Sequence, residues 1–431
     1  MRTCKKLLPG LLGCLFILAL SHPLPAAEYN YPLKNPIAAT ILGTPAKYRA
    51  KLPEKIRVKE YETITIFPER RVPDVFWYNR ELRYSIAWHR KPAPLMVVIA
   101  GTGAGYDSTK MKDLQKTFYQ AGFHVLCLSS PTHPNFVVAA SESSMPGESR
   151  ADAADLYRVM EKIWERSSKK ELVSGFYLCG YSLGAAEAAF VARLDEERKN
   201  FNFKKVLLLN PPVNIYESAV RIDQMLIDNI PGGIDHFNDF FNKLIHNIST
   251  AYVSGDFVDL SYDFFYHAYR EIIPDPSEGK ALIGFSFRIS SANLIFTADV
   301  MNNRGYIVPK NLKLFRTDSL TDYYKVATDC KGFEEYAKKL LYPYYRQHGA
   351  GNLSFDEFVE HSSLKDIEDY LRNSPKIGLM TNADDFILGP GDLDWFRRIF
   401  GERARIYPYG GHCGNLAYID NVRDMIAFFQ K

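Results

Sequence analysis

A short run with the pattern Gly-x-Ser-x-Gly, Gly180–Gly184, places a serine between a strand pattern and a helix pattern. The apolar run Gly175–Cys179 comes before it and the alanine-rich run Ala185–Phe190 follows. A strand-to-helix turn this tight brings the two elements so close that small residues are needed two positions before and after the serine. The pattern therefore predicts that Ser182 projects its hydroxyl clear of a sheet, at the positive end of a helix. Because five letters also recur by chance, the rest of the chain must supply partners for this serine.

Two later segments supply the kinds of side chain that a reactive serine needs. A serine hydroxyl is a weak nucleophile unless a base, commonly a histidine oriented by a carboxylate, removes its proton. The run Ala404–Pro408 is typical of a short strand and leads into a glycine-rich turn that holds His412. Upstream, Lys376–Met380 predicts a strand that ends near two adjacent acids, Asp384 and Asp385. Loops after strands commonly hold catalytic side chains, so we expect the base and the acid at these positions.

This order of residues resembles that of serine hydrolases with the α/β-hydrolase fold, in which the nucleophile comes first, then the acid, then the histidine. The resemblance extends from about residue 60 to the end of the chain, with one large insertion. It implies Ser182 as nucleophile, His412 as base and Asp385 as acid, because the family's acid is usually followed by one residue and then an aliphatic one. Other acids near this strand end stay open as alternatives: Asp384, Asp392 and Asp394.

The resemblance also implies an oxyanion hole on the loop after an earlier strand. The apolar run Pro94–Ala100 predicts a strand buried on both faces, and it opens into the loop Gly101–Gly105. In the family a His-Gly pair begins this loop, and the next backbone N–H acts with the N–H that follows the nucleophile. Carried over to this chain, the two donors are Thr102 and Leu183. Ala100 stands where the family has histidine, which leaves the orientation of the loop open.

The remaining candidate site residues follow from these placements. Gly180 and Gly184 are the small residues that the turn requires, while Tyr181 and the loop residue His133 are candidate substrate contacts. The glycine loop lacks the G-x-x-x-x-G-K-[ST] pattern that cradles phosphates and the G-x-G-x-x-G pattern that binds dinucleotides. Neither C-x-x-C nor H-E-x-x-H occurs in the chain. We therefore expect neither a cofactor nor a metal.

Composition agrees with a globular catalytic domain. A chain of 431 residues with 46% hydrophobic and 24% charged content can bury a sizeable core. Its formal net charge of +3 argues against a nucleic-acid partner, which needs a concentrated basic face. Cys127 and Cys179 fall within apolar strand patterns, where cysteine usually behaves as a small hydrophobe. With Cys330 and Cys413 they make an even number beyond the N-terminal segment, so disulfide pairing stays open.

The first residues have the pattern of a secretory signal. Three basic residues precede the apolar stretch Leu7–Leu20, and the small residues Pro25–Ala27 come before the expected cleavage site. The apolar stretch is short for a membrane span, so we expect an exported protein, periplasmic or secreted, with no stable span after cleavage. The alternative is lipoprotein anchoring at Cys14. Cleavage there would leave an apolar run at the mature N-terminus, so the sequence favours cleavage after Ala27.

The order of the patterns predicts an α/β domain with one large insertion. Residues 1–27 form the signal, and residues 28–56, which lack periodicity, an extended N-terminal arm. Strand and helix patterns alternate in residues 57–212 and return in residues 373–431, which predicts a mostly parallel sheet with helices on both faces. Its first two strands, within Val58–Phe67 and Glu81–Trp88, alternate like half-exposed antiparallel strands. Residues 213–372 cannot be a structureless loop, so we expect a mainly helical cap over the serine.

Several details of the helices and the cap can also be predicted. We expect a serine-capped helix over Glu148–Glu161, and another over Ser354–Leu371 whose serine cap has a glutamate three residues on. Most aromatic residues of the cap should build its own core, and a minority should line an apolar pocket above the serine. The aromatic clusters are Phe237–Phe241, Tyr262–Tyr266, Tyr323–Tyr324 and Tyr342–Tyr345.

The residues and the resemblance together imply acyl transfer to water through an acyl-enzyme intermediate. The aromatic cap favours a carboxylic ester or a lipid-like acyl group as the small-molecule substrate. Peptidases and amidases share the fold, which does not choose among these reactions. A catalytically silent binding protein that uses the cap pocket is the alternative from another class. The presence of all three triad residues favours the enzyme.

Overall fold

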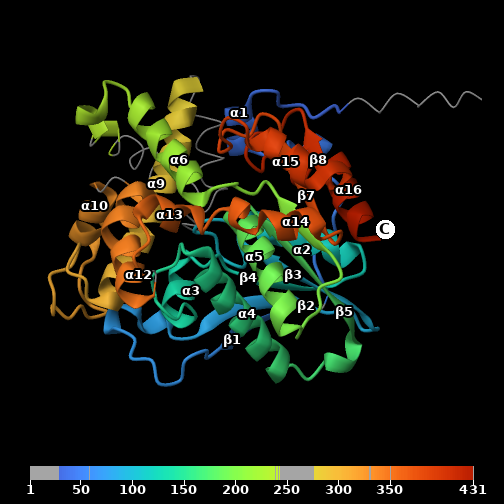
Figure 1. The fold of residues 1–431 in the computed structure, drawn as a ribbon, viewed down its shortest axis with the longest axis horizontal. Helices are drawn as coiled ribbons and strands as arrows, with labels where there is room; N and C mark the ends of the chain where they lie inside the picture. Colours follow the sequence, from blue (N-terminus) through green and yellow to red (C-terminus); the bar gives the residue numbers. More distant parts are fainter. Residues whose placement is uncertain are drawn as a thin grey trace, which may run out of the picture. The chain divides into compact units, whose positions relative to one another are not determined.

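A mixed sheet runs through the part of the chain that the structure describes, with eight strands in the order β1-β2-β4-β3-β5-β6-β7-β8 (Figure 1). The structure is a computed structural model. It describes residues 29–57, 59–237, 239–240, 242, 276–329, 332–349 and 351–430. The predicted signal segment, residues 1–27, and Cys330 lie outside the described residues. The strands are β1 (Lys59–Ile64), β2 (Leu82–Ala87), β3 (Ala93–Ile99), β4 (His124–Leu128), β5 (Val173–Tyr181), β6 (Val206–Leu209), β7 (Ile377–Asn382) and β8 (Ala404–Tyr407).

The pairing of the strands confirms the predicted fold class. β1 pairs with β2 and β2 with β4 in antiparallel fashion, and the other pairs are parallel. β4, β6 and β7 are buried along their whole length, as strands covered on both faces should be. The edge strand β1 is half-exposed as expected, whereas β2 is almost entirely buried because both of its faces are covered. Leu82, Tyr84 and Ile86 face the main core, and on the other face the Gln115 side chain donates to Ser85. This is an α/β-hydrolase fold with a large helical insertion.

Helices cover both faces of the sheet. α4 (Ser149–Arg166) and α5 (Leu183–Arg198) pack against each other on one face, where α15 (Asp392–Phe400) joins the same hydrophobic core. α2 (Thr109–Gln120) and α16 (Ile419–Gln430) lie outside that core and contact each other, with the rings of Phe118 and Phe429 edge to face at 5.5 Å. Leu126 and Leu128 of β4 belong to the first core and the intervening Cys127 does not, as strand alternation requires.

The predicted start of one helix turns out differently. The cap of α4 is Glu148, whose carboxylate accepts the backbone N–H of Ala151 at 2.7 Å. The predicted serine cap is therefore wrong, and the Ser149 hydroxyl donates to the carbonyl of Ser362 instead. A glutamate serves here because its carboxylate reaches the same unpaired N–H groups and suits the positive helix end.

The predicted helix over Ser354–Leu371 is broken into three pieces. α13 (Phe355–Glu360) has the predicted capping box, in which Ser354 and Glu357 bond each other's backbone N–H. The chain then forms the 3-10 turn η6 (Leu364–Ile367) and α14 (Glu368–Asn373). The break occurs because the Ser363 hydroxyl and the Leu364 N–H both donate to the carbonyl of Val213, across the start of the insertion.

The insertion is mainly helical in its described part. α9, whose bounds are Pro276–Asn302, contacts α6, α10 and α11, and Figure 1 shows these helices gathered at one side of the sheet. Its segment Ser277–Asn302 is long and apolar enough to cross a membrane, but 67% of the apolar window is buried, so packing accounts for its composition. Other helices of the insertion among the described residues include α6 (Ile215–Asn229), α10 (Thr321–Asp329), α11 (Gly332–Tyr336), the π-helical turn η5 (Ala337–Leu341) and α12 (Tyr342–His348).

The N-terminal arm is not extended throughout, as the sequence had suggested. Pro36–Leu42 form the helix α1, and the Asn35 side chain caps it by accepting the N–H of Ile37 and Ala38. A capping asparagine followed by proline at the first helical position is a good helix start, although the run is too short to show periodicity. α1 packs on α9, so this arm also contacts the cap.

Candidate active site

Ser182 lies in the tight turn between β5 and α5, with φ 55° and ψ −129°. A positive φ is strained for a residue with a side chain, and the surrounding packing holds it. A Cβ on Gly180 would lie 1.9 Å from the carbonyl oxygen of Gly184. One on Gly184 would lie 2.4 Å from the carbonyl oxygens of Ile99 and Ala100. Both positions therefore require glycine for steric reasons.

The structure brings together the three residues that the sequence proposes as a triad. His412 Nε2 lies 2.8 Å from Ser182 Oγ. His412 Nδ1 lies 3.1 and 3.0 Å from the two carboxylate oxygens of Asp385. When Nδ1 donates to Asp385, Nε2 is left to accept the hydrogen of the serine hydroxyl. The three side chains come from loops after β5, β7 and β8, at the carboxyl ends of neighbouring parallel strands.

Further donors hold Asp385, whose exposed fraction is 4%. The side-chain amide of Asn210 donates to its Oδ2 at 2.9 Å, and the N–H of Ile387 donates to Oδ1 at 3.3 Å. Asn210 directly follows β6 and has a φ of 48°. Sequence analysis did not single it out. A polar residue directly after an apolar strand, at the edge that holds the serine, was the available signal.

The neighbouring acid, Asp384, points elsewhere. Its carboxylate accepts the backbone N–H groups of Gly410 and Gly411 at 3.2 and 2.8 Å. It thus holds the loop that leads to His412 and does not contact the imidazole. Burial raises the pKa of Asp384, although the two N–H groups oppose that shift. The geometry separates an acid that bonds the histidine from one that positions its loop.

The two further alternatives for the acid are bonded away from the site. Asp392 accepts the N–H of Gly389 at 2.7 Å, at the start of α15. Asp394 forms an exposed ion pair with Arg397 on the same helix, at 2.7 Å. Neither carboxylate is bonded to the histidine.

Two opposing effects act on the protonation of His412. Burial favours the neutral imidazole, but the charge of Asp385 and its hydrogen bond to Nδ1 outweigh burial and raise the pKa of His412 above its ordinary value. Cys413, the next residue, has a φ of 60° and its Sγ lies 3.9 Å from Nε2.

The N-terminal arm reaches this site, which sequence analysis did not foresee. The hydroxyl of Thr40 on α1 accepts the backbone N–H of His412 at 2.8 Å. The hydroxyls of Tyr31 and Thr44 donate to the carbonyl of Gly414. The loop that holds the histidine is therefore fixed by Asp384 on one side and by the arm on the other.

The two proposed oxyanion donors flank the serine. A Cβ on Gly101 would lie 3.0 Å from Ser182 Cβ, so the glycine loop rests against the turn. The Gly103 N–H donates to the Thr132 hydroxyl at 2.8 Å, which fixes the loop although Ala100 replaces the family's histidine. In the described part of the chain, the N–H of Thr102 donates to no protein acceptor, and the N–H of Leu183 opens α5, where helices leave it unpaired.

A cavity of about 910 Å³ opens over Ser182 between the strand ends and the cap. Its apolar part includes Ile215, Ile222, Leu282, Phe287, Leu341 and Phe386. Its polar part includes Thr102, Asp107, Ser108, Thr132, His133 and Asn293. The two proposed substrate contacts, Tyr181 and His133, both line it. His133 Nδ1 also accepts the N–H of Asn135 to cap the short helix α3 (Pro134–Ala139), and burial lowers the pKa of His133 to about 4.

The described members of the predicted aromatic clusters do not line the cavity. Its aromatic side chains are Tyr181, Tyr216, Phe287, Phe333, Tyr336, Phe358 and Phe386. None belongs to the predicted clusters, of which Tyr262–Tyr266 and Phe241 lie outside the described residues. The other members pack inside the cap, as Tyr324 does against Phe296 at 4.9 Å. Tyr323 also lies against Phe296, and Tyr342 and Tyr345 contact Phe358 of α13.

Other chemistry has little support at this site. No group of three or more His, Cys, Asp or Glu side chains that could hold a metal ion occurs among the described residues. Cys127, Cys179 and Cys413 are buried free thiols. Burial raises the pKa of Cys127 and of Cys179, so these thiols stay protonated and unreactive.

Comparisons with known proteins give only a distant likeness. A scan against protein-family profiles finds no match, and neither does a search of curated protein sequences. Among solved structures, the chain is similar to the thioesterase domain from the curacin biosynthetic pathway, with 13% identity over 87% of this chain and 100% of that one and a TM-score of 0.38. It is also similar to an esterase from Pyrococcus furiosus (9% identity, 86% and 90% coverage, TM-score 0.41) and to one from Pyrobaculum calidifontis (14%, 87% and 82%, 0.38). Because these TM-scores are low, the fold class rests on the strand order and pairing described above.

Proposed function

We propose that this protein is an exported serine hydrolase that cleaves carboxylic esters through an acyl-enzyme intermediate. The observation that carries the proposal is the continuous contact from Ser182 Oγ through the His412 imidazole to Asp385, on the floor of a large cavity. A serine hydroxyl 2.8 Å from an imidazole nitrogen, with a buried carboxylate behind the ring, is poised for nucleophilic attack.

In the proposed reaction, Ser182 Oγ attacks the carbonyl carbon of the ester while His412 Nε2 takes the hydroxyl proton. Asp385 holds the ring by its Nδ1–H and stabilises the imidazolium. The N–H groups of Thr102 and Leu183 bind the oxyanion. The proton then passes from Nε2 to the leaving alkoxide, which departs as the alcohol. In the second half, His412 takes a proton from water, whose oxygen attacks the acyl carbon, and the carboxylic acid leaves as the serine is restored.

The lining of the cavity supports an ester with an apolar acyl group. Aliphatic and aromatic side chains of α6, α9 and η5 face the serine from the cap. Burying apolar groups of the substrate against them contributes roughly 25 cal/mol per Å² of surface removed from water. The predominance of apolar side chains on the cap side of the cavity favours ester over peptide as substrate.

Labelling with a fluorophosphonate probe tests the serine chemistry directly. We expect the probe to modify the wild type and to leave Ser182→Ala unmodified. Ser286→Ala is the matched control, because Ser286 lines the same cavity without contacting the histidine, and it should still be labelled. Absence of labelling in well-folded wild type would instead support the catalytically silent binding protein.

A substrate series then decides the class of bond. We expect hydrolysis of p-nitrophenyl esters to exceed that of aminoacyl p-nitroanilides, with the rate depending on acyl length. Faster cleavage of the anilides would favour the peptidase or amidase alternative. The export part of the proposal rests on the pattern of residues 1–27. It predicts Glu28 as the first residue of the mature protein, whereas an acylated Cys14 would favour the lipoprotein alternative.

A further inference from the structure

A second cavity, of about 350 Å³, lies at the opposite end of the sheet from Ser182. It lies between the sheet and the last turns of α4, which runs antiparallel to the parallel strands, and it opens to solvent. Leu95 and Phe176, which line it, stand near the beginnings of β3 and β5, whereas the serine follows the end of β5. The two cavities have no lining residue in common.

The floor of the second cavity is one row of side chains across the sheet. Glu60 pairs with Ile86, Ile86 with Leu126, and Leu126 with Val97, so these four residues from β1, β2, β4 and β3 stand side by side on one face. All four line the cavity. The roof comes from α4 and the segments around it: Met160, Ile163, Trp164, Ser167, Ser168 and Phe201.

The cavity is too large to be a packing defect. Protein interiors contain few voids larger than a water molecule. At roughly 30 Å³ of liquid volume per water, this volume corresponds to about a dozen waters, or to a ligand of about ten to twelve non-hydrogen atoms. It also falls within the range of about 300 to 1,000 Å³ that is usual for small-molecule sites.

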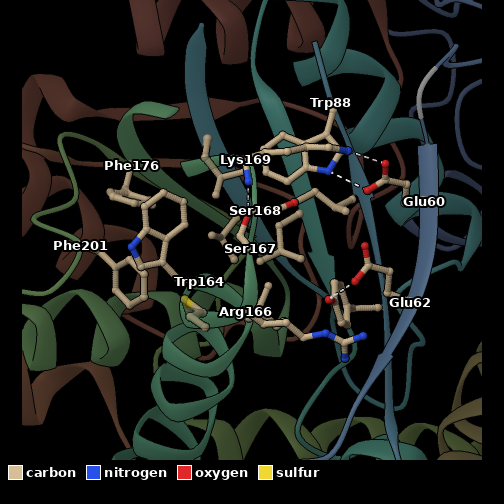
Figure 2. A pocket seen from close by; sticks show the side chains of 17 residues that line it. Glu60, Glu62, Trp88, Trp164, Arg166, Ser167, Ser168, Lys169, Phe176 and Phe201 are labelled. Atoms are coloured by element: carbon tan, nitrogen blue, oxygen red, sulfur yellow. Dashed lines mark hydrogen bonds and ion pairs between the residues drawn. The ribbon is translucent and has the colours of Figure 1, made fainter. Parts of the chain in front are cut away.

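The interior of the cavity is apolar and partly aromatic. Figure 2 shows Trp164, Phe176 and Phe201 together on one side, across from Glu60 and Glu62 of β1. The ring of Phe176 is edge to face with Trp164 at 4.9 Å and with Phe201 at 5.2 Å. Such a wall holds its shape and offers an apolar body a preformed surface.

One of the two carboxylates at the mouth is fully engaged. Glu60 accepts the Lys169 ammonium at 2.5 Å through Oε1 and the Trp88 indole N–H at 2.9 Å through Oε2. The same ammonium lies 5.1 Å from the centroid of the Trp88 ring. These contacts fix the rim and place one donor on each oxygen of Glu60.

The other carboxylate, Glu62, retains an open side. Its Oε2 accepts the Tyr84 hydroxyl at 2.6 Å, and no described cation lies within 4.0 Å of it. Arg166, the cation drawn nearest in Figure 2, donates its Nη1 to the carbonyl of Thr63 at 2.7 Å. Burial and the adjacent Glu62 raise the pKa of Tyr84, although the charge of Arg166 opposes that shift, so the Tyr84 hydroxyl stays protonated and donates to Glu62.

We propose that this cavity binds a small organic ammonium compound, with its apolar body on the aromatic wall and its ammonium group on Glu62 Oε1. An ammonium supplies the donor and the charge that the carboxylate lacks, and charge-assisted hydrogen bonds are among the stronger ones. Lys169 offsets the charge of Glu60, so a ligand carboxylate would be repelled by Glu62 alone, and a neutral alcohol would gain the hydrogen bond without the charge. The site is independent of the proposed hydrolase activity.

Three probes with the same phenyl body test the assignment: phenethylamine, 2-phenylethanol and 3-phenylpropionate. Calorimetric titration of the wild type should give saturable binding in the order amine, alcohol, acid. Glu62→Gln keeps the shape of the rim and removes the charge of Glu62. It should therefore weaken the binding of phenethylamine by about tenfold or more and leave the affinity for 2-phenylethanol unchanged.

A matched pair of variants distinguishes the two cavities. Ile163→Trp fills the second cavity and should abolish binding of phenethylamine. Ala219→Phe narrows the catalytic cavity and should leave the binding of phenethylamine unchanged, since Ala219 lines only the catalytic cavity. The proposal would be overturned if 3-phenylpropionate bound most tightly of the three probes, or if none of them bound saturably. It would also be overturned if Glu62→Gln bound phenethylamine as tightly as the wild type does. Because Glu62 is at the rim, Glu62→Gln keeps the test decisive even if Ile163→Trp fails to fold.

Discussion

The two cavities lie at opposite ends of one sheet, and they differ in where their polar groups come from. At the carboxyl ends of the strands, Ser182, Asn210 and Cys413 all stand on loops, each with a positive φ. At the other end, Glu60 and Glu62 belong to a regular strand, and their directions follow from strand alternation alone. The difference indicates that convergent catalytic geometry requires irregular backbone, whereas a binding volume can be built from regular elements.

The largest expected effect separates the two adjacent acids at the catalytic end. Asp385→Asn should lower kcat/KM for a p-nitrophenyl ester by about 10³- to 10⁴-fold, because an amide no longer holds the productive tautomer or stabilises the imidazolium. Asp384→Asn is the matched control and should lose less than about tenfold, since the Asp384 carboxylate bonds only loop N–H groups. Equal losses in both variants would contradict the assignment of Asp385 as the acid.

The pH profile gives the next largest effect. Because Asp385 raises the pKa of His412, the base form of the histidine appears only as the pH rises through that raised pKa, and kcat/KM should rise with it. Removing the charge in Asp385→Asn should move this limb to lower pH, by about one to three units. Stopped-time assays between pH 5 and 10 would measure the shift. A limb that moves to higher pH, or that moves equally in Asp384→Asn, would show that another group controls it.

Acyl-chain preference tests the apolar character of the catalytic cavity. Ala219 is buried on α6 where that helix lines the cavity, so Ala219→Phe should fill part of the space for a long chain. We expect the ratio of kcat/KM for a dodecanoate over an acetate ester to fall by about tenfold or more, while acetate hydrolysis is nearly retained. An equal loss on both esters would place the acyl group elsewhere.

Stability should also depend on pH at the catalytic end, because of a carboxyl group without partners. Glu187 on α5 has an exposed fraction of 0%, and neither of its oxygens has a hydrogen-bond partner among the described residues. Burial, with the charges of Asp152 and Glu148, raises the pKa of Glu187. The folded state therefore keeps the proton that the unfolded state releases, so this contribution is full below the unfolded pKa and is lost as the pH rises toward the folded one.

Replacing this group should flatten the dependence. Between the unfolded and the folded pKa of Glu187, the wild type loses about 1.4 kcal/mol of unfolding free energy per pH unit because of this group. The unfolding free energy of Glu187→Gln should fall less steeply with pH. The exposed Glu197→Gln on the same helix is the control and should keep the wild-type slope. Denaturant midpoints at pH 5 and pH 8 give both slopes. Identical slopes in the wild type and Glu187→Gln would show that Glu187 is not protonated in the fold.

The residues of the proposed triad could be picked out from the sequence because each of them stands in a recognisable local pattern. A serine with glycines on both sides, between a strand and a helix, can be recognised without knowing its contacts, and so can a histidine after a strand. The Asp384 and Asp385 pair could not be resolved from the residues alone, since two adjacent side chains point in different directions only once the turn is built. Thr40 could not be found at all, because its contact with His412 joins residues 372 positions apart.

The second cavity has no comparable local pattern in the sequence. Its floor is defined by the register of neighbouring strands, and a shift of one residue would turn Glu60 and Glu62 away from it. The aromatic lining of the cap could not be predicted for a related reason. Its aromatic residues are numerous, and which of them face the serine depends on how α9 is oriented, not on their number.

The smallest expected effect concerns the link between the two ends. Ile163→Trp fills the second cavity but should change kcat/KM for ester hydrolysis by no more than about twofold, because distant sites without shared partners act independently. α4 is one of the elements that join the ends, as β5 is, since Ile163 lies in the last turns of α4 and its capping residue Glu148 follows Gly147, which lines the catalytic cavity. Measuring kcat/KM in Ile163→Trp with and without phenethylamine therefore reveals whether α4 transmits changes. A tenfold loss in a variant that unfolds like the wild type would show that the two cavities are coupled through this helix.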